Sequence, residues 1–82
     1  MNTSELRAER IRQGKNVKYM ASVIGKSEDT YAKKERGAVK FDTTEMVLIQ
    51  NDLNLSPAQF NAIFFDFKLL FGKIPRFSSS NL

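Results

Sequence analysis

Glycines divide the first half of the chain into short segments, each with the length and pattern of one helix. Gly14, Gly25 and Gly37 stand at the ends of these segments. Glycine adopts the left-handed backbone with which many helices end more easily than other residues do. The stops leave room for a first helix before Gly14, a second over Val17–Ile24 and a third over Glu28–Arg36. The chain is therefore expected to fold as a small all-α domain.

Capping residues place the start of each helix and indicate two further helices. An oxygen-bearing side chain just before a helix accepts a hydrogen bond from one of its free N–H groups. The predicted N-caps are Thr3 or Ser4, Asn16, Ser27, Asp42 or Thr43, and Ser56. Ser56 is followed by Pro57 at the first helical position and by Gln59 as a capping-box partner. Five helices are therefore predicted.

Apolar residues recur at helical spacing and define the expected inner faces. In the second helix Val17, Met20, Ala21 and Ile24 fall at i, i+3, i+4 and i+7. The inner faces expected elsewhere are Leu6, Ala8 and Ile11 in the first helix, Tyr31, Lys34 and Glu35 in the third, and Val47, Leu48, Leu53 and Leu55 in and after the fourth. The core should be small, since a chain of this length buries only about 60% of its unfolded surface.

The residue types that are missing exclude several classes of function. The chain has no cysteine and no histidine, which excludes disulfides, thiol catalysis and the usual zinc sites and fits a reducing cytoplasm. No apolar run approaches the ~18 residues of a membrane span. No glycine-rich phosphate loop or paired carboxylates of an active site stand out. We therefore expect no catalytic residue, metal, cofactor, small-molecule substrate or membrane association.

Basic charge is concentrated in the first half of the chain. Residues 1–40 hold ten Lys and Arg and five Asp and Glu, a net charge of +5, whereas residues 41–82 hold three and four, a net charge of −1. Together these give the net charge of +4. A basic surface of this kind favours a polyanionic partner. A merely soluble surface is the alternative, and charge alone does not decide between them.

The second and third predicted helices form a recognisable pair. They are joined by the short turn Gly25–Ser27, and two short helices joined by a glycine-containing turn form a helix-turn-helix. Ala21 supplies the small residue where the two helices would cross. Tyr31 supplies the residue that would lock the second helix onto the first. The sequence therefore predicts this motif over Val17–Arg36.

The run "RIRQGKNVKYMASVIGKSEDTYAKKERG", residues 10–37, resembles the lambda-repressor-like (Cro/C1-type) family of bacterial and phage regulators. The residues at matching places are Gly14, Met20–Ala21, Ile24–Gly25, Ser27, Thr30–Tyr31 and Glu35–Arg36–Gly37. The run "TYAKKERG", residues 30–37, is similar to the corresponding run in small Cro-like regulators of Gram-positive bacteria and their phages. The resemblance covers about residues 4–65. It implies a five-helix domain that binds a double-stranded DNA operator in the bacterial cytoplasm, with Arg10 and Glu35 as a structural ion pair.

The resemblance also implies two sets of DNA contacts. The base contacts fall at the start of the third helix, which would enter the major groove: Ser27, Glu28, Asp29, Thr30 and Lys33. The phosphate contacts fall at helix starts and on nearby basic residues: Asn16, Val17, Lys18, Arg36, Lys40, Thr43 and Thr44. Lys15 would add to the neutralisation of phosphate charge.

Departures from the family pattern leave a second function open. Val17 stands where glutamine is usual, and Lys34 where a buried aromatic residue or leucine is usual. Glu28 and Asp29 stand where the family usually has neutral or basic residues that contact the bases. A carboxylate can accept a hydrogen bond from cytosine N4, but it is repelled by phosphates. The alternative is an antirepressor, or modulator of repression, that docks its acidic helix on the basic recognition helix of a phage repressor. An antitoxin of a toxin–antitoxin pair is a third and less favoured function.

The segment Phe60–Phe71 carries more apolar surface than a five-helix core needs. It could wrap the core, or it could form an interface with a second copy or another partner, as exposed apolar patches often do. The candidate interface residues are Phe64, Phe65, Phe67, Leu70 and Phe71. Gly72 is expected to end the domain, so residues 1–72 would form it and residues 73–82 a loose tail.

Overall fold

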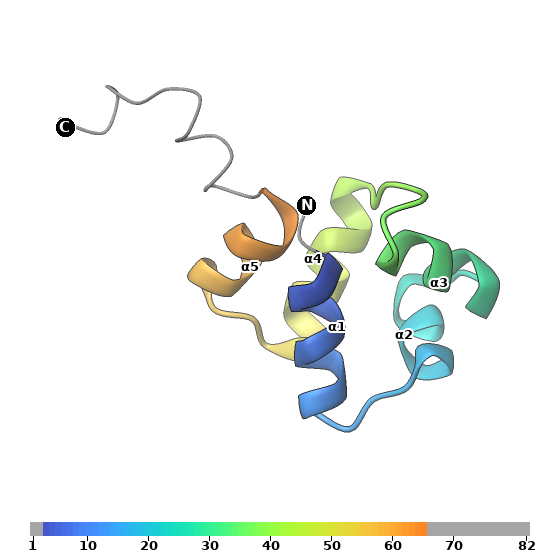
Figure 1. Cartoon of the computed structure of the whole chain (residues 1–82), viewed down its shortest axis with the longest axis horizontal. Helices are drawn as coiled ribbons and strands as arrows, with labels where there is room; N and C mark the ends of the chain where they lie inside the picture. The colour runs from blue at the N-terminus through green and yellow to red at the C-terminus, as the bar shows by residue number, and fades with distance from the viewer. Residues whose placement is uncertain (1–2, 66–82) are drawn as a thin grey trace, which may run out of the picture.

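The computed structural model of the chain describes residues 3–65, and this part contains five α-helices and no strand (Figure 1). The helices are α1 (Thr3–Arg12), α2 (Val17–Ile24), α3 (Glu28–Glu35), α4 (Thr43–Leu53) and α5 (Pro57–Phe64). The predicted all-α class is confirmed. The predictions for the domain end at residue 72, for the tail, and for Phe67, Leu70 and Phe71 lie outside the described residues.

α1 and α2 make the main contacts between the helices. α1 lies beside α5 and also contacts α3, while α2 packs against both α3 and α4. Figure 1 shows α5 and the pair α2–α3 at opposite sides of the domain, with α1 between them. α2 and α3 are therefore held by neighbours on one side and face solvent on the other. None of the helices in the described part is long and apolar enough to cross a membrane.

Side-chain caps start four of the helices as the sequence predicts. Asn16 Oδ1 accepts a hydrogen bond from the Tyr19 N–H at 2.8 Å, and Ser27 Oγ accepts one from the Thr30 N–H at 3.1 Å. Asp42 and Ser56 each form a complete capping box with the residue three positions later. The choice between Asp42 and Thr43 is thereby settled in favour of Asp42. α1 differs, because Thr3 and Ser4 are both already helical and neither is its N-cap.

The core is built from buried side chains of all five helices and of the segments after α3 and α4. These are Leu6, Met20, Ala21, Ile24, Tyr31, Phe41, Ile49, Leu53, Leu55, Ile63 and Phe64. The apolar face predicted for α2 is confirmed, with Val17 partly buried against the core. Tyr31, Phe41 and Phe64 form a row of rings with centroids 6.0 and 5.7 Å apart. Phe64 is thus a core residue, not the interface residue that the sequence suggested.

The inner face predicted for α4 is wrong in part. Val47 and Leu48 are 43% and 38% exposed, and the buried residues of the helix are Glu45, Ile49 and Leu53. Those three recur every four residues, whereas Val47 and Leu48 lie about 200° and 100° around the helix from Ile49. Four consecutive apolar residues, "MVLI", leave the orientation of a helix ambiguous, and Glu45 faces inward because Lys34 pairs with it.

The inner face predicted for α1 is also corrected. Leu6 is buried as expected, but Ile11 is 51% exposed and Ala8 is exposed as well. Arg10 takes the inner position, four residues after Leu6 and therefore on the same side of the helix. A charged side chain can occupy this place because its partner, Glu35, is buried beside it.

The orientation of α4 can be tested with two substitutions. Ile49→Ala is expected to lower the free energy of unfolding by about 2–5 kcal/mol, because it empties part of the core. Val47→Ala is expected to change it by no more than about 0.5 kcal/mol, because the side chain is largely in solvent. Urea unfolding followed by circular dichroism measures both. Equal losses of unfolding free energy in the two variants would show that Val47 is as buried as Ile49, so that a different side of α4 would face the core.

Candidate functional site

One face of α3 is polar and exposed, and the other is anchored in the domain. Ser27, Glu28, Asp29 and Lys33 are exposed and Thr30 is partly so, whereas Tyr31, Lys34 and Glu35 are buried. The predicted base-contacting residues therefore lie on the outer side of one helix, with Lys33 in its last turn and Ser27, Glu28, Asp29 and Thr30 at its start. Ser27 closes this end by donating from Oγ to Thr30 Oγ1 at 3.0 Å.

The acidic start of α3 is partly neutralised within the helix. Lys33 Nζ lies 3.0 Å from Asp29 Oδ2, four residues earlier, and both side chains are largely in solvent. Such exposed pairs are weak, at about 0.3–0.5 kcal/mol, and exchange readily for other partners. Glu28 also favours the helix start through the helix dipole. The outer side of α3 thus offers carboxylates near its start and one ammonium group a turn later.

A buried ion pair joins α1 to α3 behind this face. Arg10 Nε and Nη2 donate to Glu35 Oε2 and Oε1 at 2.8 and 3.0 Å, a two-point contact. Tyr31 Oη donates to the same Glu35 Oε2 at 2.8 Å, and Arg10 Nη1 donates to the Lys15 carbonyl at 2.9 Å. Hydrogen bonding to Glu35 raises the pKa of Arg10 above its ordinary value. The structure therefore contains the pair that the resemblance implies, and it fixes α3 against α1.

Burial of Tyr31 has a measurable consequence at high pH. Desolvation, followed by the hydrogen bond to Glu35, raises the pKa of the Tyr31 phenol above its ordinary value. In the unfolded chain the phenol loses its proton near pH ~10, whereas in the folded domain it keeps it. The unfolded state then binds fewer protons, so stability is complete below pH ~10 and falls as pH rises above it, by up to about 1.4 kcal/mol per pH unit.

Urea unfolding between pH 9 and 11 tests this, with Tyr31→Phe as the comparison. The variant is expected to lose stability with pH less steeply than the parent chain, by about half a proton at pH 10 and close to one proton at pH 11. Lysines titrate in both proteins, so their contribution cancels in the difference. Parallel curves would show that the phenol ionises alike in the folded and unfolded states.

A second buried ion pair, which the sequence did not reveal, joins α3 to α4. Lys34 Nζ donates to Glu45 Oε1 at 2.7 Å and to the Lys40 carbonyl at 3.1 Å. Glu45 Oε1 also accepts from the Asp42 N–H at 3.0 Å as part of the capping box. Lys26 Nζ lies 3.9 Å from Glu45 Oε2. The capping-box spacing from Asp42 to Glu45 was the available signal, since it brings a carboxylate to the start of α4.

The two helix starts predicted to bind phosphate differ in charge. α2 begins at the neutral cap Asn16, and Val17 is partly buried, so only its backbone N–H can serve an anion. α4 begins at Asp42, with Thr43 and Thr44 exposed. A phosphate approaching the start of α4 would meet the carboxylate of the cap. The start of α2 is therefore the better anion site of the two.

A groove between α1 and α3, at the start of α2, adds an arginine that the sequence reasoning missed; it is called the arginine groove. The groove has a volume of about 490 Å³ and is lined by Ser4, Arg7, Arg10, Val17, Ala32, Glu35 and Arg36. Arg10 and Glu35 neutralise each other, which leaves Arg7 and Arg36 as the uncompensated charges of the lining. Arg7 and Arg36 are both exposed. Their separation by 29 positions in the chain hid the pairing, and only the packing of α1 on α3 brings them to one groove.

The lysines predicted to neutralise phosphate charge lie outside this groove. Lys18 and Lys40 are exposed. Lys15 is engaged elsewhere, since its Nζ lies 3.0 Å from Asp52 Oδ2 and 4.9 Å from the centre of the Tyr19 ring. Its hydrogen bond to Asp52 raises the pKa of Lys15. Among residues 3–65, no group of three or more acidic, histidine or cysteine side chains is arranged to hold a metal ion.

Comparison of the chain with protein-family models, with curated proteins and with solved structures found no match. The features of the chain that bear on its function are therefore α2, α3 and the arginine groove that Arg7 and Arg36 line.

Proposed function

We propose that the protein is a sequence-specific DNA-binding regulator of the lambda-repressor-like, Cro/C1 type. In this proposal α2, the turn Gly25–Ser27 and α3 form a helix-turn-helix, and α3 enters the major groove. The observation that carries the proposal is the division of α3 into two sides. Every buried residue of the helix is tied to α1 or α4 or packed in the core, and its exposed start presents only polar groups.

The surroundings of α3 support a polyanionic partner. The groove with Arg7 and Arg36 and the start of α2 lie next to the end of α3, where a phosphate backbone would run if the helix start faced the bases. The base-contacting residues would then be Ser27, Glu28, Asp29, Thr30 and Lys33. Carboxylates at the helix start accept hydrogen bonds from cytosine N4, so the preferred site should contain C·G pairs there.

Selection of bound duplexes from a random DNA pool at about 100 mM salt tests the proposal. Enrichment of one motif with C·G pairs at fixed positions is the expected result. Weak binding that depends on salt and shows no preferred sequence would contradict a sequence-specific regulator.

A second function is favoured by the same exposed carboxylates. Glu28 and Asp29 project from the start of α3 into solvent, and this arrangement would suit a basic surface on another protein. The second candidate is therefore an antirepressor whose α3 docks on the basic recognition helix of a phage repressor and blocks its access to DNA. One small domain can serve both functions if its affinity for DNA is modest.

Removal of the two carboxylates separates these functions. Glu28→Gln with Asp29→Asn is expected to strengthen non-specific DNA binding by roughly threefold to tenfold, because it removes two charges that repel phosphate. The same change should erase the preference for C·G pairs. Fluorescence anisotropy with a random duplex and with the selected duplex measures both effects. If DNA binding is unaffected and capture of a repressor is lost, the antirepressor function is the correct one.

A further inference from the structure

Asp29 and Lys33 are the side chains of α3 that point most directly away from the domain. The buried residues of the helix are Tyr31, Lys34 and Glu35. With about 3.6 residues per turn, Asp29 and Lys33 lie about 165° and 155° around the helix from the middle of this buried side, whereas Glu28 lies about 65° from it. A surface that approaches α3 from outside therefore meets Asp29 and Lys33 first.

The two side chains form one unit, the Asp29–Lys33 pair. Lys33 Nζ lies 3.0 Å from Asp29 Oδ2, and the side chains of Lys33 and Asp29 are 48% and 76% exposed. The pairing uses one hydrogen of the ammonium group and one lone pair of the carboxylate, so both groups keep others for a partner. The pair carries no net charge. It therefore presents an acceptor and a donor side by side, and it meets less repulsion from phosphates than an isolated carboxylate does.

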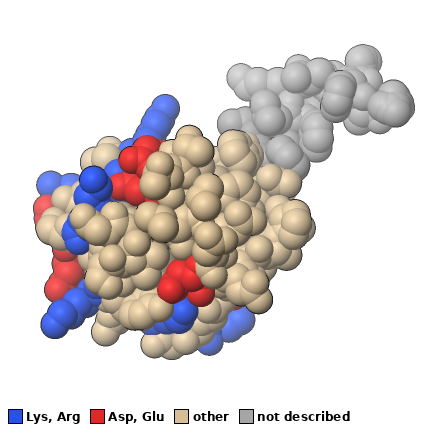
Figure 2. Space-filling view, turned by 180° about the vertical axis from the view of Figure 1, so that it is seen from behind, with Lys and Arg blue, Asp and Glu red and all other residues tan. Residues whose placement is uncertain are grey.

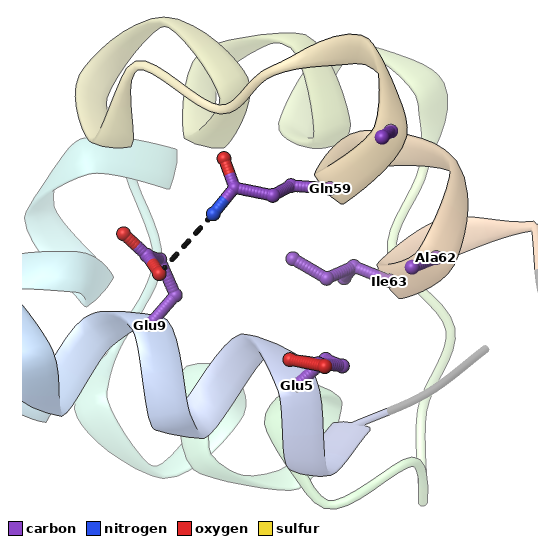
Figure 3. A pocket seen from close by; sticks show the side chains of 6 residues that line it. Glu5, Glu9, Gln59, Ala62 and Ile63 are labelled. Carbon is purple, nitrogen blue, oxygen red and sulfur yellow. Dashed lines mark hydrogen bonds between the residues drawn. The ribbon is translucent and has the colours of Figure 1, made fainter.

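Charged groups of both signs lie along the edge of the molecule that α2 and α3 form, at the left of the view in Figure 2. A second groove, between α1 and α5, contains the carboxylates of Glu5 and Glu9 and has a volume of about 180 Å³. Figure 3 shows Gln59 reaching across this groove, where its Nε2 donates to Glu9 Oε1 at 3.3 Å, and Glu9 also pairs with Arg12. The Glu9 carboxylate is thus occupied within the domain, whereas the Asp29–Lys33 pair faces solvent and is open to a partner.

We propose that the Asp29–Lys33 pair reads one C·G base pair as a unit. The Asp29 carboxylate accepts a hydrogen bond from cytosine N4, and Lys33 Nζ donates one to guanine O6. Cytosine N4 and guanine O6 are themselves joined by a hydrogen bond within the base pair, so they stand about 2.9 Å apart. Asp29 Oδ2 and Lys33 Nζ are 3.0 Å apart, so donor meets acceptor at both positions. The inference rests on the proposed function, in which α3 enters the major groove.

The pattern of groups at the edge of a base pair selects C·G over the other three pairs. G·C and T·A place an acceptor against the carboxylate and a donor against the ammonium group. A·T presents a donor and an acceptor in the right order, but its N7 acceptor lies beside the donor, where it would face the carboxylate. In C·G the N7 acceptor lies beside O6, where it gives Lys33 a second acceptor. C·G is therefore expected to be preferred and A·T to come second.

Selection of bound duplexes with the parent chain and three alanine variants tests the inference. The parent chain is expected to enrich a C·G pair at one position of its motif. Asp29→Ala and Lys33→Ala should each lower the preference at that same position roughly tenfold, within the discrimination of one good two-point contact. Arg12→Ala is the matched control, because it breaks an exposed ion pair of α1 that lies outside the helix-turn-helix, and it should leave the motif unchanged. Circular dichroism verifies that the variants are folded.

Exchanging the two residues is the sharper test. Asp29→Lys combined with Lys33→Asp swaps the positions of acceptor and donor without changing the net charge of the chain. The preferred base pair at that position is therefore expected to change from C·G to G·C. The helix dipole disfavours a lysine in the first turn of α3, so circular dichroism is measured on this variant as well, and the alanine variants decide the question if it is unfolded.

The inference is wrong if Asp29→Ala and Lys33→Ala relax different positions of the motif, if either leaves the preference intact, or if a folded exchange variant still selects C·G. In each of these cases the parent chain still selects a motif, so the proposed function stands. A parent chain that enriches no motif overturns the proposed function and the inference together. The two failures are thus distinguished in a single experiment.

Discussion

Glu35→Ala is expected to lower the free energy of unfolding by about 3–5 kcal/mol, because it breaks a buried ion pair by removing one partner. The substitution leaves the buried Arg10 guanidinium without its two-point partner and removes the acceptor of the Tyr31 hydroxyl. Small domains have roughly 5–15 kcal/mol of stability in total. The variant should therefore be partly unfolded at 37 °C, as measured by urea and thermal unfolding at neutral pH.

Two controls separate the buried charge from a general loss of contacts. Arg10→Met combined with Glu35→Leu and Tyr31→Phe should restore most of the stability, because replacing a buried ion pair by apolar residues of similar size is often neutral or stabilising and the third change removes the hydroxyl that would lose its acceptor. Lys33→Ala removes the exposed pair with Asp29 and should cost no more than about 0.5 kcal/mol. A loss below about 1 kcal/mol in Glu35→Ala would mean that Arg10 reaches solvent when its partner is removed.

Arg7→Ala combined with Arg36→Ala is expected to weaken DNA binding by roughly 150-fold at low salt. Each arginine in the groove would make a charge-assisted hydrogen bond to phosphate worth about 1.5 kcal/mol, and about 1.4 kcal/mol corresponds to tenfold in affinity. The plot of log affinity against log salt should become shallower by about 2, since each neutralised phosphate contributes about 0.9 to its slope. Fluorescence anisotropy at several salt concentrations measures both quantities.

Arg12→Ala is the matched control for this pair. Arg12 lies on α1 as Arg7 does and is exposed, but it pairs with Glu9 and does not line the groove. Its removal should change the slope by much less than one unit. If Arg12→Ala has the same effect as Arg7→Ala, the domain attracts DNA through its overall charge and the groove has no particular part in binding. The sequence preference should survive in the double variant, because phosphate contacts position a protein and base contacts specify the site.

The mixed charge of α3 is compatible with both proposed partners, DNA and the basic surface of a repressor protein. Lys33 is paired with Asp29 within the helix, so the carboxylate and the ammonium group that are both proposed to contact bases neutralise each other before any partner arrives. The energy of an exposed pair is small enough for either partner to displace it. Affinity for DNA is therefore expected to come mainly from the arginine groove and the start of α2, and selectivity from Glu28 and Asp29.

The sequence by itself determined the starts of four of the five helices in residues 3–65. Asn16, Ser27, Asp42 and Ser56 cap helices in the structure as predicted, because capping depends on side chains within three residues of each other. Gly25 ends α2 in the left-handed conformation, with φ of +71°. The apolar face of α2 could likewise be read from its spacing. These are local properties, and local sequence is sufficient to predict them.

Only the tertiary structure decided which way α1 and α4 face, that Lys34 pairs with Glu45, and that Arg7 and Arg36 line one groove. Arg10 and Glu45 point inward, and Ile11, Val47 and Leu48 outward, because a partner from another helix neutralises each buried charge. The same packing of α1 on α3 brings Arg7 and Arg36 to one groove, and the packing of α1 on α5 forms a second one. The hydrophobic periodicity of a helix ranks its side chains by polarity alone. The free energy of burying a charged side chain depends instead on the partner that it meets in the fold. That partner lies 25 residues away in the sequence for Arg10 and 11 residues away for Glu45.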